Sequence, residues 1–204
     1  MSDYRNSIFF DSLASELNCK DTVLIGGFSR SGKTTFAEHL RLASLSIGMR
    51  TWTISIDRWL KDLDCRTPGV VGRYDLSEIR DILSLRHAGH AKEICLKLPE
   101  YNKHTQSKEF TGASIQIYPQ DILIVEGTIA LTLVSHCESA RCIYLETDES
   151  IRRLRVIKEY VSRGKTPIEA ERIYIDRQFD EIPIIKQSSA HATYTFLTDM
   201  HVNK

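Results

Sequence analysis

Short, strongly apolar runs recur along the chain and predict buried strands. Residues 22–25 and 122–125 are β-branched or aliphatic throughout, and each run leads directly into a glycine-containing pair, Gly26-Gly27 and Glu126-Gly127. Runs of this length that end in turn residues are typical of strands buried in a parallel sheet. Similar runs predict further strands at 51–56, 142–145 and 193–197.

Longer stretches between these runs have apolar residues at helical spacing. Residues 5–18 form one such stretch, and residues 36–47 form another in which Ile47 is expected on the buried face before Gly48 ends the helix. Further helices are predicted at 75–89, 128–136 and 149–162, and one more begins near Thr166. Strands that alternate with helices indicate a mainly parallel sheet with helices on both faces.

Two of these helices have recognisable start signals. Asp75 and Glu78 are spaced as the N-cap and N3 residues of the helix 75–89. Thr166 and Glu169 have the same spacing, and Pro167 occupies the first helical position that proline favours.

The region between 89 and 119 is less regular. It predicts two short strands, 94–98 and 114–118, that are separated by a polar stretch at 99–112.

Composition and charge narrow the class of protein. The chain has 204 residues, of which 42% are hydrophobic, and this length suits a single globular domain. Lys and Arg (27) balance Asp and Glu (27), so no general basic field favours nucleic acid or an anionic membrane as a partner. The N-terminal residues are interrupted by charges, and no run approaches the length of a membrane span. Five scattered cysteines are expected to be reduced thiols, so we expect a soluble, cytoplasmic protein.

The clearest chemical motif lies between the first strand and the second helix. Residues 27–34 read GFSRSGKT and fit the P-loop pattern GxxxxGK[ST]. In this context backbone N–H groups and a helix N-terminus point at a phosphate chain. Lys33 is expected to reach the β and γ phosphates, and the Thr34 hydroxyl is expected to bind Mg²⁺. The remaining nucleotide-binding candidates are Gly27, Ser29, Arg30, Ser31, Gly32 and Thr35.

Two carboxylates follow predicted strands. Asp57 closes the strand 51–56, at the sheet edge where ligands of parallel sheets bind, and there a carboxylate accepts or orients the proton of an attacking hydroxyl. The spacing fits equally well with an N-cap for a helix at 58–63. Glu126 closes the strand 122–125 in the place of a Walker-B acid, which serves Mg²⁺. The alternative is a strand-end carboxylate paired with an arginine, and we favour the metal role.

The helix 149–162 and the residues that follow it are rich in cations. The cations of residues 152–165 are Arg152, Arg153, Arg155, Lys158, Arg163 and Lys165. Because the chain as a whole is neutral, this local excess favours a mobile cationic lid over a triphosphate, with Arg155, Lys158 and Arg163 as the main candidates. A solvated helix face and a nucleic-acid contact are the alternatives. The second is disfavoured because aromatic residues are not interleaved with the cations.

These motifs together resemble the uridine kinase and phosphoribulokinase family of P-loop small-molecule kinases. The resemblance covers about residues 21–197. It rests on five segments in the same order: IGGFSRSGKTT (25–35), ISIDRW (54–59), LPEYN (98–102), ILIVEGTIAL (122–131) and RLRVIKEYVSRGK (153–165). It implies a three-layer P-loop fold, with residues 20–58 carrying the P-loop and catalytic Asp, 59–118 the acceptor site, 119–147 the Walker-B-like unit and 148–186 the lid.

The resemblance also implies roles for single residues. Asp57 becomes the catalytic base, Tyr101 lines the acceptor pocket, Glu126 serves Mg²⁺, and lid positions fall on Arg155, Lys158, Arg163 and Lys165. Trp59, beside Asp57, is a further candidate for the substrate pocket. His104 is another, although it lies two residues short of the family's nucleoside-contacting His.

Departures from the family pattern concern the acceptor. Leu60 stands where uridine kinases usually carry a Tyr, Asn102 replaces an Asp, and Gly69 occupies the slot of the Asp that holds the ribose hydroxyls. Uridine therefore does not follow as the acceptor, and Asp64, Arg66 and Arg73 are candidates for a rebuilt acceptor site.

We therefore expect a kinase that transfers phosphate from ATP, or alternatively GTP, with Mg²⁺ to a hydroxyl of a small metabolite such as a nucleoside, sugar or related alcohol. Its partners are then the nucleotide and a small-molecule acceptor, with a homo-oligomer as a further expectation. Two alternatives remain. One is a regulatory NTPase without an acceptor. The other is a nucleoside monophosphate kinase, whose anion pocket draws on Arg66, Arg73 and Arg86.

Overall fold

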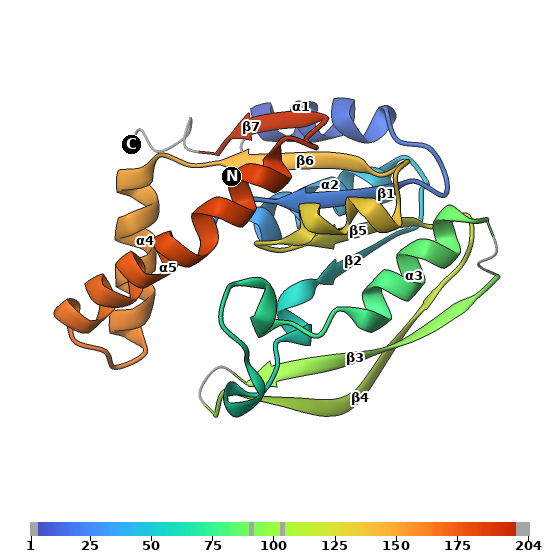
Figure 1. The fold of residues 1–204 in the computed structure, drawn as a ribbon. Coiled ribbons are helices and arrows are strands. Elements are labelled where there is room, and N and C mark those ends of the chain that lie inside the picture. Colours follow the sequence, from blue (N-terminus) through green and yellow to red (C-terminus); the bar gives the residue numbers. More distant parts are fainter. Residues whose placement is uncertain (1–3, 90–91, 103–104, 199–204) are drawn as a thin grey trace.

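A five-stranded parallel sheet forms the centre of the molecule in this computed structural model, which describes residues 4–89, 92–102 and 105–198 (Figure 1). The strands are β1 (Thr22–Gly26), β2 (Thr51–Ser55), β5 (Ile122–Glu126), β6 (Arg141–Glu146) and β7 (Tyr194–Leu197). Their spatial order is β2-β5-β1-β6-β7, and every neighbouring pair is parallel. The apolar runs thus predicted all five strands to within one residue at each end.

Helices cover both faces of the sheet, as the alternation of elements predicts. On one face, α1 (Tyr4–Ser15) and α2 (Lys33–Ser46) pack through Phe10, Phe36 and Leu40 onto β1 and β5. On the other, α3 (Ser77–His87) and the 3-10 helix η4 (Ala130–His136) enclose a second apolar cluster that includes Ile79, Leu83 and Leu131. This is the three-layer arrangement expected for a P-loop fold. The finer subdivision of the chain into functional segments stays a prediction.

A long antiparallel hairpin contains the two strands predicted at 94–98 and 114–118 and extends both of them into the stretch 99–112, which the sequence predicts to be a polar connection. Strand β3 (Ile94–Asn102) pairs with β4 (Ser107–Ile117) from Ile94↔Ile117 to Asn102↔Ser107, with a register shift between Lys97 and Pro99. The hairpin lies apart from the central sheet, beyond α3 (Figure 1). Only one side of it meets the core, where Leu96 and Ile117 are buried. Most outer positions are polar, with the exposed Phe110 as an exception, and this polarity is why the hydrophobic pattern predicts a loop there.

Two adjacent helices project from the carboxyl end of β6. Helix α4 (Glu149–Ser162) has the predicted bounds, and α5 (Pro167–Ser189) starts with the predicted capping box, in which Thr166 and Glu169 exchange hydrogen bonds. The two helices lie side by side, and α5 runs back to the sheet, where β7 follows (Figure 1). The connection between β2 and α3 contains three single turns of 3-10 helix: η1 (Ile56–Trp59), η2 (Leu63–Cys65) and η3 (Val71–Arg73).

Three local expectations differ from the structure. Helix α3 starts at Ser77 with Leu76 as its N-cap residue, so Asp75 is not the cap, although its carboxylate accepts a hydrogen bond from the Ser77 hydroxyl at 2.8 Å. Ile47 is 49% exposed because α2 ends at Ser46 and the chain turns away. No helix at 58–63 follows Asp57, which lies inside η1. In the described part of the chain, no helix has both the length and the apolar character needed to cross a membrane.

Candidate active site

The three elements with predicted chemistry meet because β2, β5 and β1 are neighbours in the sheet. Their carboxyl ends carry Asp57, Glu126 and the P-loop, respectively. All three line one cleft of about 2140 Å³, which also reaches α4 and α5. A pocket for one small ligand has roughly 300–1,000 Å³. The cleft therefore has room for both a nucleotide and an acceptor.

The P-loop backbone is fixed by glycines and leaves a helix end open. At Gly27, with φ of +142°, an added Cβ would lie 2.4 Å from the Leu145 carbonyl oxygen, so only glycine fits. Gly32, with φ of +84°, is the N-cap residue of α2 and offers no side chain to the amides of the first turn. In the described part of the chain, the buried Ser29 Oγ has no hydrogen-bond partner. Free donors at a helix N-terminus are the features that bind phosphate.

Lys33, Thr34 and Glu126 form the centre of the site. The buried Lys33 Nζ donates to the Phe28 carbonyl oxygen at 2.6 Å, which folds the ammonium over the loop. Burial lowers the pKa of Lys33, and Glu126 and Asp57 oppose this shift. Thr34 Oγ1 donates to Glu126 Oε1 at 3.1 Å. Burial raises the pKa of Glu126, whereas Ser55, Lys33 and Thr34 lower it.

The hydroxyl and carboxylate of Thr34 and Glu126 suit Mg²⁺. Both are hard oxygen donors, and Mg²⁺ in nucleotide sites typically takes only one or two protein ligands beside phosphate oxygens and water. Among the residues that the structure describes, no cluster of three or more His, Cys, Asp or Glu forms an all-protein cage for a metal. The donor set therefore fits a magnesium ion that arrives with the nucleotide. The Glu126 carboxylate accepts hydrogen bonds from the hydroxyl groups of Thr34 and Ser55. The alternative, in which Glu126 pairs with an arginine, is therefore wrong.

Asp57 faces the P-loop across the cleft and receives a hydrogen bond from Tyr74. The Tyr74 hydroxyl donates to Asp57 Oδ1 at 3.2 Å. Burial raises the pKa of Tyr74 well above that of an ordinary tyrosine, and Asp57 raises it further, so this hydroxyl stays a donor. The N-cap interpretation of Asp57 is wrong, because the residue lies within η1, where Ser55 is the N-cap residue. Its carboxylate is left to face the cleft, which it lines.

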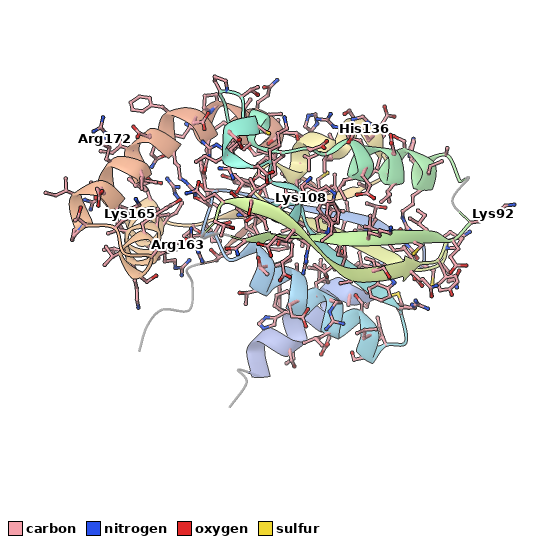
Figure 2. All side chains as sticks on the ribbon, turned by 90° about the horizontal axis from the view of Figure 1, so that it is seen from below. Lys92, Lys108, His136, Arg163, Lys165 and Arg172 are labelled. Atoms are coloured by element: carbon pink, nitrogen blue, oxygen red, sulfur yellow. The ribbon has the colours of Figure 1, made fainter. Side chains whose placement is uncertain are left out.

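The cationic helix α4 closes one side of the cleft. The predicted lid residues Arg155, Lys158, Arg163 and Lys165 all line it. Figure 2 shows Arg163 and Lys165 near each other where α4 gives way to α5, with Arg172 farther along α5. Glu159 forms ion pairs with both Arg163 and the P-loop residue Arg30. Arg155 Nη1 donates to the Arg30 carbonyl oxygen at 3.3 Å. The helix thus contacts the phosphate-binding loop directly.

Arg152 anchors helix α4 to its neighbours. The sequence shows it only as one of several cations and does not predict this structural role. It is only 1% exposed, and its guanidinium stacks on the rings of Phe28 and Tyr174 at 4.6 and 5.1 Å from their centroids. The sequence offers one signal: Arg152 shares a helix face with Val156, the buried apolar residue four positions later.

The predicted substrate residues divide into three groups. Tyr101 lines the cleft, and its hydroxyl accepts a hydrogen bond from Arg66, which also lines the cleft. Trp59 does not line it: the ring is 3% exposed in the core, and Nε1 donates to Glu78 at 3.0 Å. That expectation is therefore wrong, because η1 turns the residue away from Asp57. His104 lies outside the described residues.

Arg66, Arg73 and Arg86, the candidates for an anion pocket, do not lie close together. Arg66 and Arg73 line the cleft, whereas Arg86 donates to carbonyl oxygens of Tyr118 and Asp121 at the opposite end of the sheet. Arg73 forms an ion pair with Asp180. Asp64 is exposed in η2 and does not line the cleft. The geometry thus disfavours the nucleoside monophosphate alternative.

Helix α5 contributes carboxylates that the sequence did not indicate. Asp176, Asp180 and Glu181 line the cleft. Asp180 Oδ1 lies 3.9 Å from where a Cβ at Gly69 would be, so α5 supplies a carboxylate beside this glycine. From sequence alone, acidic residues in a helix are expected to face solvent. Their place in the cleft follows from the path of α5, which runs back to the sheet.

The fold is similar to that of several P-loop small-molecule kinases of known structure. A proposed fructose transport system kinase from Silicibacter sp. TM1040 aligns with a TM-score of 0.70 at 15% identity, covering 94% of this chain and 98% of the other. A proposed uridine kinase from Bacillus stearothermophilus gives 0.59 at 18% identity, with 96% and 100% covered. D-glycerate 3-kinase from Cryptococcus neoformans var. grubii gives 0.58 at 11% identity, with 90% and 87% covered. No protein-family model and no curated protein sequence matches the chain. The likeness therefore concerns the fold.

Proposed function

We propose that the protein is a Mg²⁺- and ATP-dependent kinase that phosphorylates a hydroxyl of a small metabolite. The observation that carries the proposal is the meeting of Lys33, the Thr34–Glu126 pair and Asp57 in one cleft. A regulatory NTPase without an acceptor has no use for Tyr101 in the cleft or for the cations of α4 that line it. The structures of similar fold reported above are named as a fructose transport system kinase, a uridine kinase and a D-glycerate 3-kinase, a range that fits one fold with varied acceptors.

The roles follow from position and charge. The P-loop amides, the Ser29 hydroxyl and Lys33 hold the triphosphate, with Arg155, Lys158 and Arg163 on its other side. Thr34 and Glu126 hold Mg²⁺, which neutralises charge on the phosphates when it is bound. Asp57 accepts the proton of the acceptor hydroxyl, and Tyr74 holds that carboxylate in place. Phosphoryl transfer needs mainly such positioning and neutralisation from a protein.

The test is ADP release in the presence of nucleosides, sugars, polyols and hydroxy acids, for the wild type and Asp57→Asn. At least one acceptor is expected to stimulate ADP release by the wild type. Asp57→Asn is expected to lose turnover by about 10³-fold or more while its affinity for Mg·ATP stays within about twofold. An equal loss of nucleotide affinity in the variant argues against the base assignment. Hydrolysis that no acceptor changes argues for an NTPase instead.

A further inference from the structure

Glu181 is a buried carboxylate in the cleft that lacks adequate partners. The residue is 2% exposed, on the part of α5 that lines the cleft. Its Oε1 lies 3.7 Å from Arg73 Nη1 and 3.8 Å from Arg177 Nη1, beyond hydrogen-bond distance. Its Oε2 has no hydrogen-bond partner among the residues that the structure describes. Burial of a carboxylate without hydrogen bonds is costly, so a group of this kind in a cleft calls for a ligand.

Glu181 faces the same centre as the proposed base. It raises the pKa of Tyr74 together with Asp57, whose carboxylate the Tyr74 hydroxyl contacts. It also opposes the lowering of the pKa of Lys33, as Asp57 does. The two carboxylates therefore lie within electrostatic reach of one tyrosine and of the P-loop lysine, although one follows β2 and the other belongs to α5.

The chemistry of Oε2 defines what it binds. An ionised carboxylate only accepts hydrogen bonds, so the ligand group must be a donor. An ammonium group is disfavoured because Arg73 and Arg177 already lie beside Glu181. An anionic acceptor is disfavoured because the carboxylates of Asp57, Asp180 and Glu181 line this side of the cleft, and Arg73 is already paired with Asp180. A neutral hydroxyl group satisfies both conditions.

We infer that Glu181 binds a second hydroxyl of the acceptor, and that the acceptor is a neutral polyhydroxylated molecule with one hydroxyl at Asp57 and another at Glu181. This inference rests on the proposed kinase function. Glu181 Oε2 is shielded from solvent. A neighbouring side chain must therefore move before a hydroxyl of the acceptor can reach it. Arg177 is the side chain best placed to move. It contacts Glu181 at 3.8 Å and lies over the Tyr160 ring at 5.3 Å, so its movement breaks only weak interactions.

The experiment measures acceptor and nucleotide KM for the wild type, Glu181→Gln and Glu181→Met. Methionine keeps the length of the side chain but removes the acceptor oxygens, and glutamine keeps one of them. The control is Glu171→Gln, on the same helix but in an exposed ion pair with Arg153. The probes are uridine, D-ribose and D-fructose, a 2-deoxy or 3-deoxy analogue of each, and D-glycerate as an anionic acceptor.

We expect the acceptor KM of the wild type's best neutral polyol to rise about 10-fold in Glu181→Gln and about 100-fold in Glu181→Met, with the KM for Mg·ATP unchanged. For one deoxy analogue of that polyol, the wild type and Glu181→Met should have equal KM, because the hydroxyl that Glu181 binds is missing. The Glu171→Gln control should match the wild type throughout.

Three results would overturn the inference. The first is an unchanged acceptor KM in both Glu181 variants, and the second is a rise that is the same for the parent polyol and every deoxy analogue, which indicates a structural role. The third is a wild-type preference for D-glycerate over all neutral polyols. In each case wild-type turnover keeps the kinase proposal intact. Absence of wild-type turnover with every probe contradicts the kinase proposal and removes the inference with it.

Discussion

At the scale of single residues, Gly27 is a position of the P-loop where only glycine fits. Replacement by alanine puts a methyl group 2.4 Å from the Leu145 carbonyl oxygen, at a φ of +142° that side chains rarely adopt. We expect Gly27→Ala to lower the free energy of unfolding by about 3 kcal/mol or more. Gly32→Ala is the matched control, because φ is +84° but the space is open, and its cost should be about 1 kcal/mol. Equal losses in urea unfolding would contradict the steric account.

Tyr74 is expected to position Asp57 over a wide pH range. Because burial raises the pKa of Tyr74 well above 10.0, its hydroxyl remains protonated and keeps donating to Asp57 below that pH. Tyr74→Phe should lower kcat about tenfold without changing the KM for Mg·ATP. The ratio of wild-type to variant kcat should stay constant from about pH 6 to about pH 9. A ratio that falls toward one as the pH rises to 9 would show that Tyr74 ionises and that this account of it is wrong. Tyr118→Phe, at a ring that stacks with Arg50 outside the cleft, serves as control.

The sequence predicts site residues best where they follow a strand. Asp57, Glu126 and Lys33 are found this way because a carboxyl strand end has a fixed place in a parallel sheet. Tyr74 and Glu181 carry no such signal, since each reaches the cleft through a tertiary path: the 3-10 turns before α3 and the return of α5. Trp59 is predicted to line the cleft because it is close to Asp57 in sequence, but its side chain is buried in the core. Closeness in sequence does not predict which way a side chain of η1 points.

At the scale of elements, Arg152 holds α4 to the P-loop and to α5. Its guanidinium lies between the rings of Phe28 and Tyr174, and its side chain is 1% exposed. Arg152→Ala removes this packing and should lower the free energy of unfolding by about 2–4 kcal/mol. The neighbouring Arg153→Ala removes only an exposed ion pair with Glu171 and should change it by less than about 0.5 kcal/mol. Similar losses in the two variants would mean that Arg152 is not the anchor.

Element boundaries follow from sequence where local chemistry sets them. The start of α5 is predictable because Thr166, Pro167 and Glu169 satisfy its first amides within four residues. The full length of the hairpin β3–β4 is not, because its apolar core contacts, from Ile94, Leu96, Leu98, Ile115 and Ile117, lie only in the two short predicted strands. Its pairing is set by contacts between strands, which a hydrophobic pattern does not encode.

At the scale of the whole molecule, the order of the strands decides the site. Placing β5 between β2 and β1 brings Glu126 between Asp57 and the P-loop, and α4 and α5 then close the cleft with cations and carboxylates. The alternation of strands and helices predicts the layers, and the P-loop motif predicts the face that binds phosphate. The proposed acceptor side is formed by α5 and the segment 57–74, which the sequence does not predict to be neighbours.

The central claim is that the loop from Gly27 to Thr34 binds the phosphates of Mg·ATP. The most direct test is calorimetric titration of Mg·ATP into the wild type, Lys33→Ala and Lys97→Ala, the last of which removes an exposed lysine of β3. The wild type and Lys97→Ala should bind one equivalent with equal affinity. Lys33→Ala should bind at least about 100-fold more weakly, since it loses the buried cation that faces the phosphates. A wild-type protein that shows no heat of binding, or a Lys33→Ala variant with full affinity, would contradict the account.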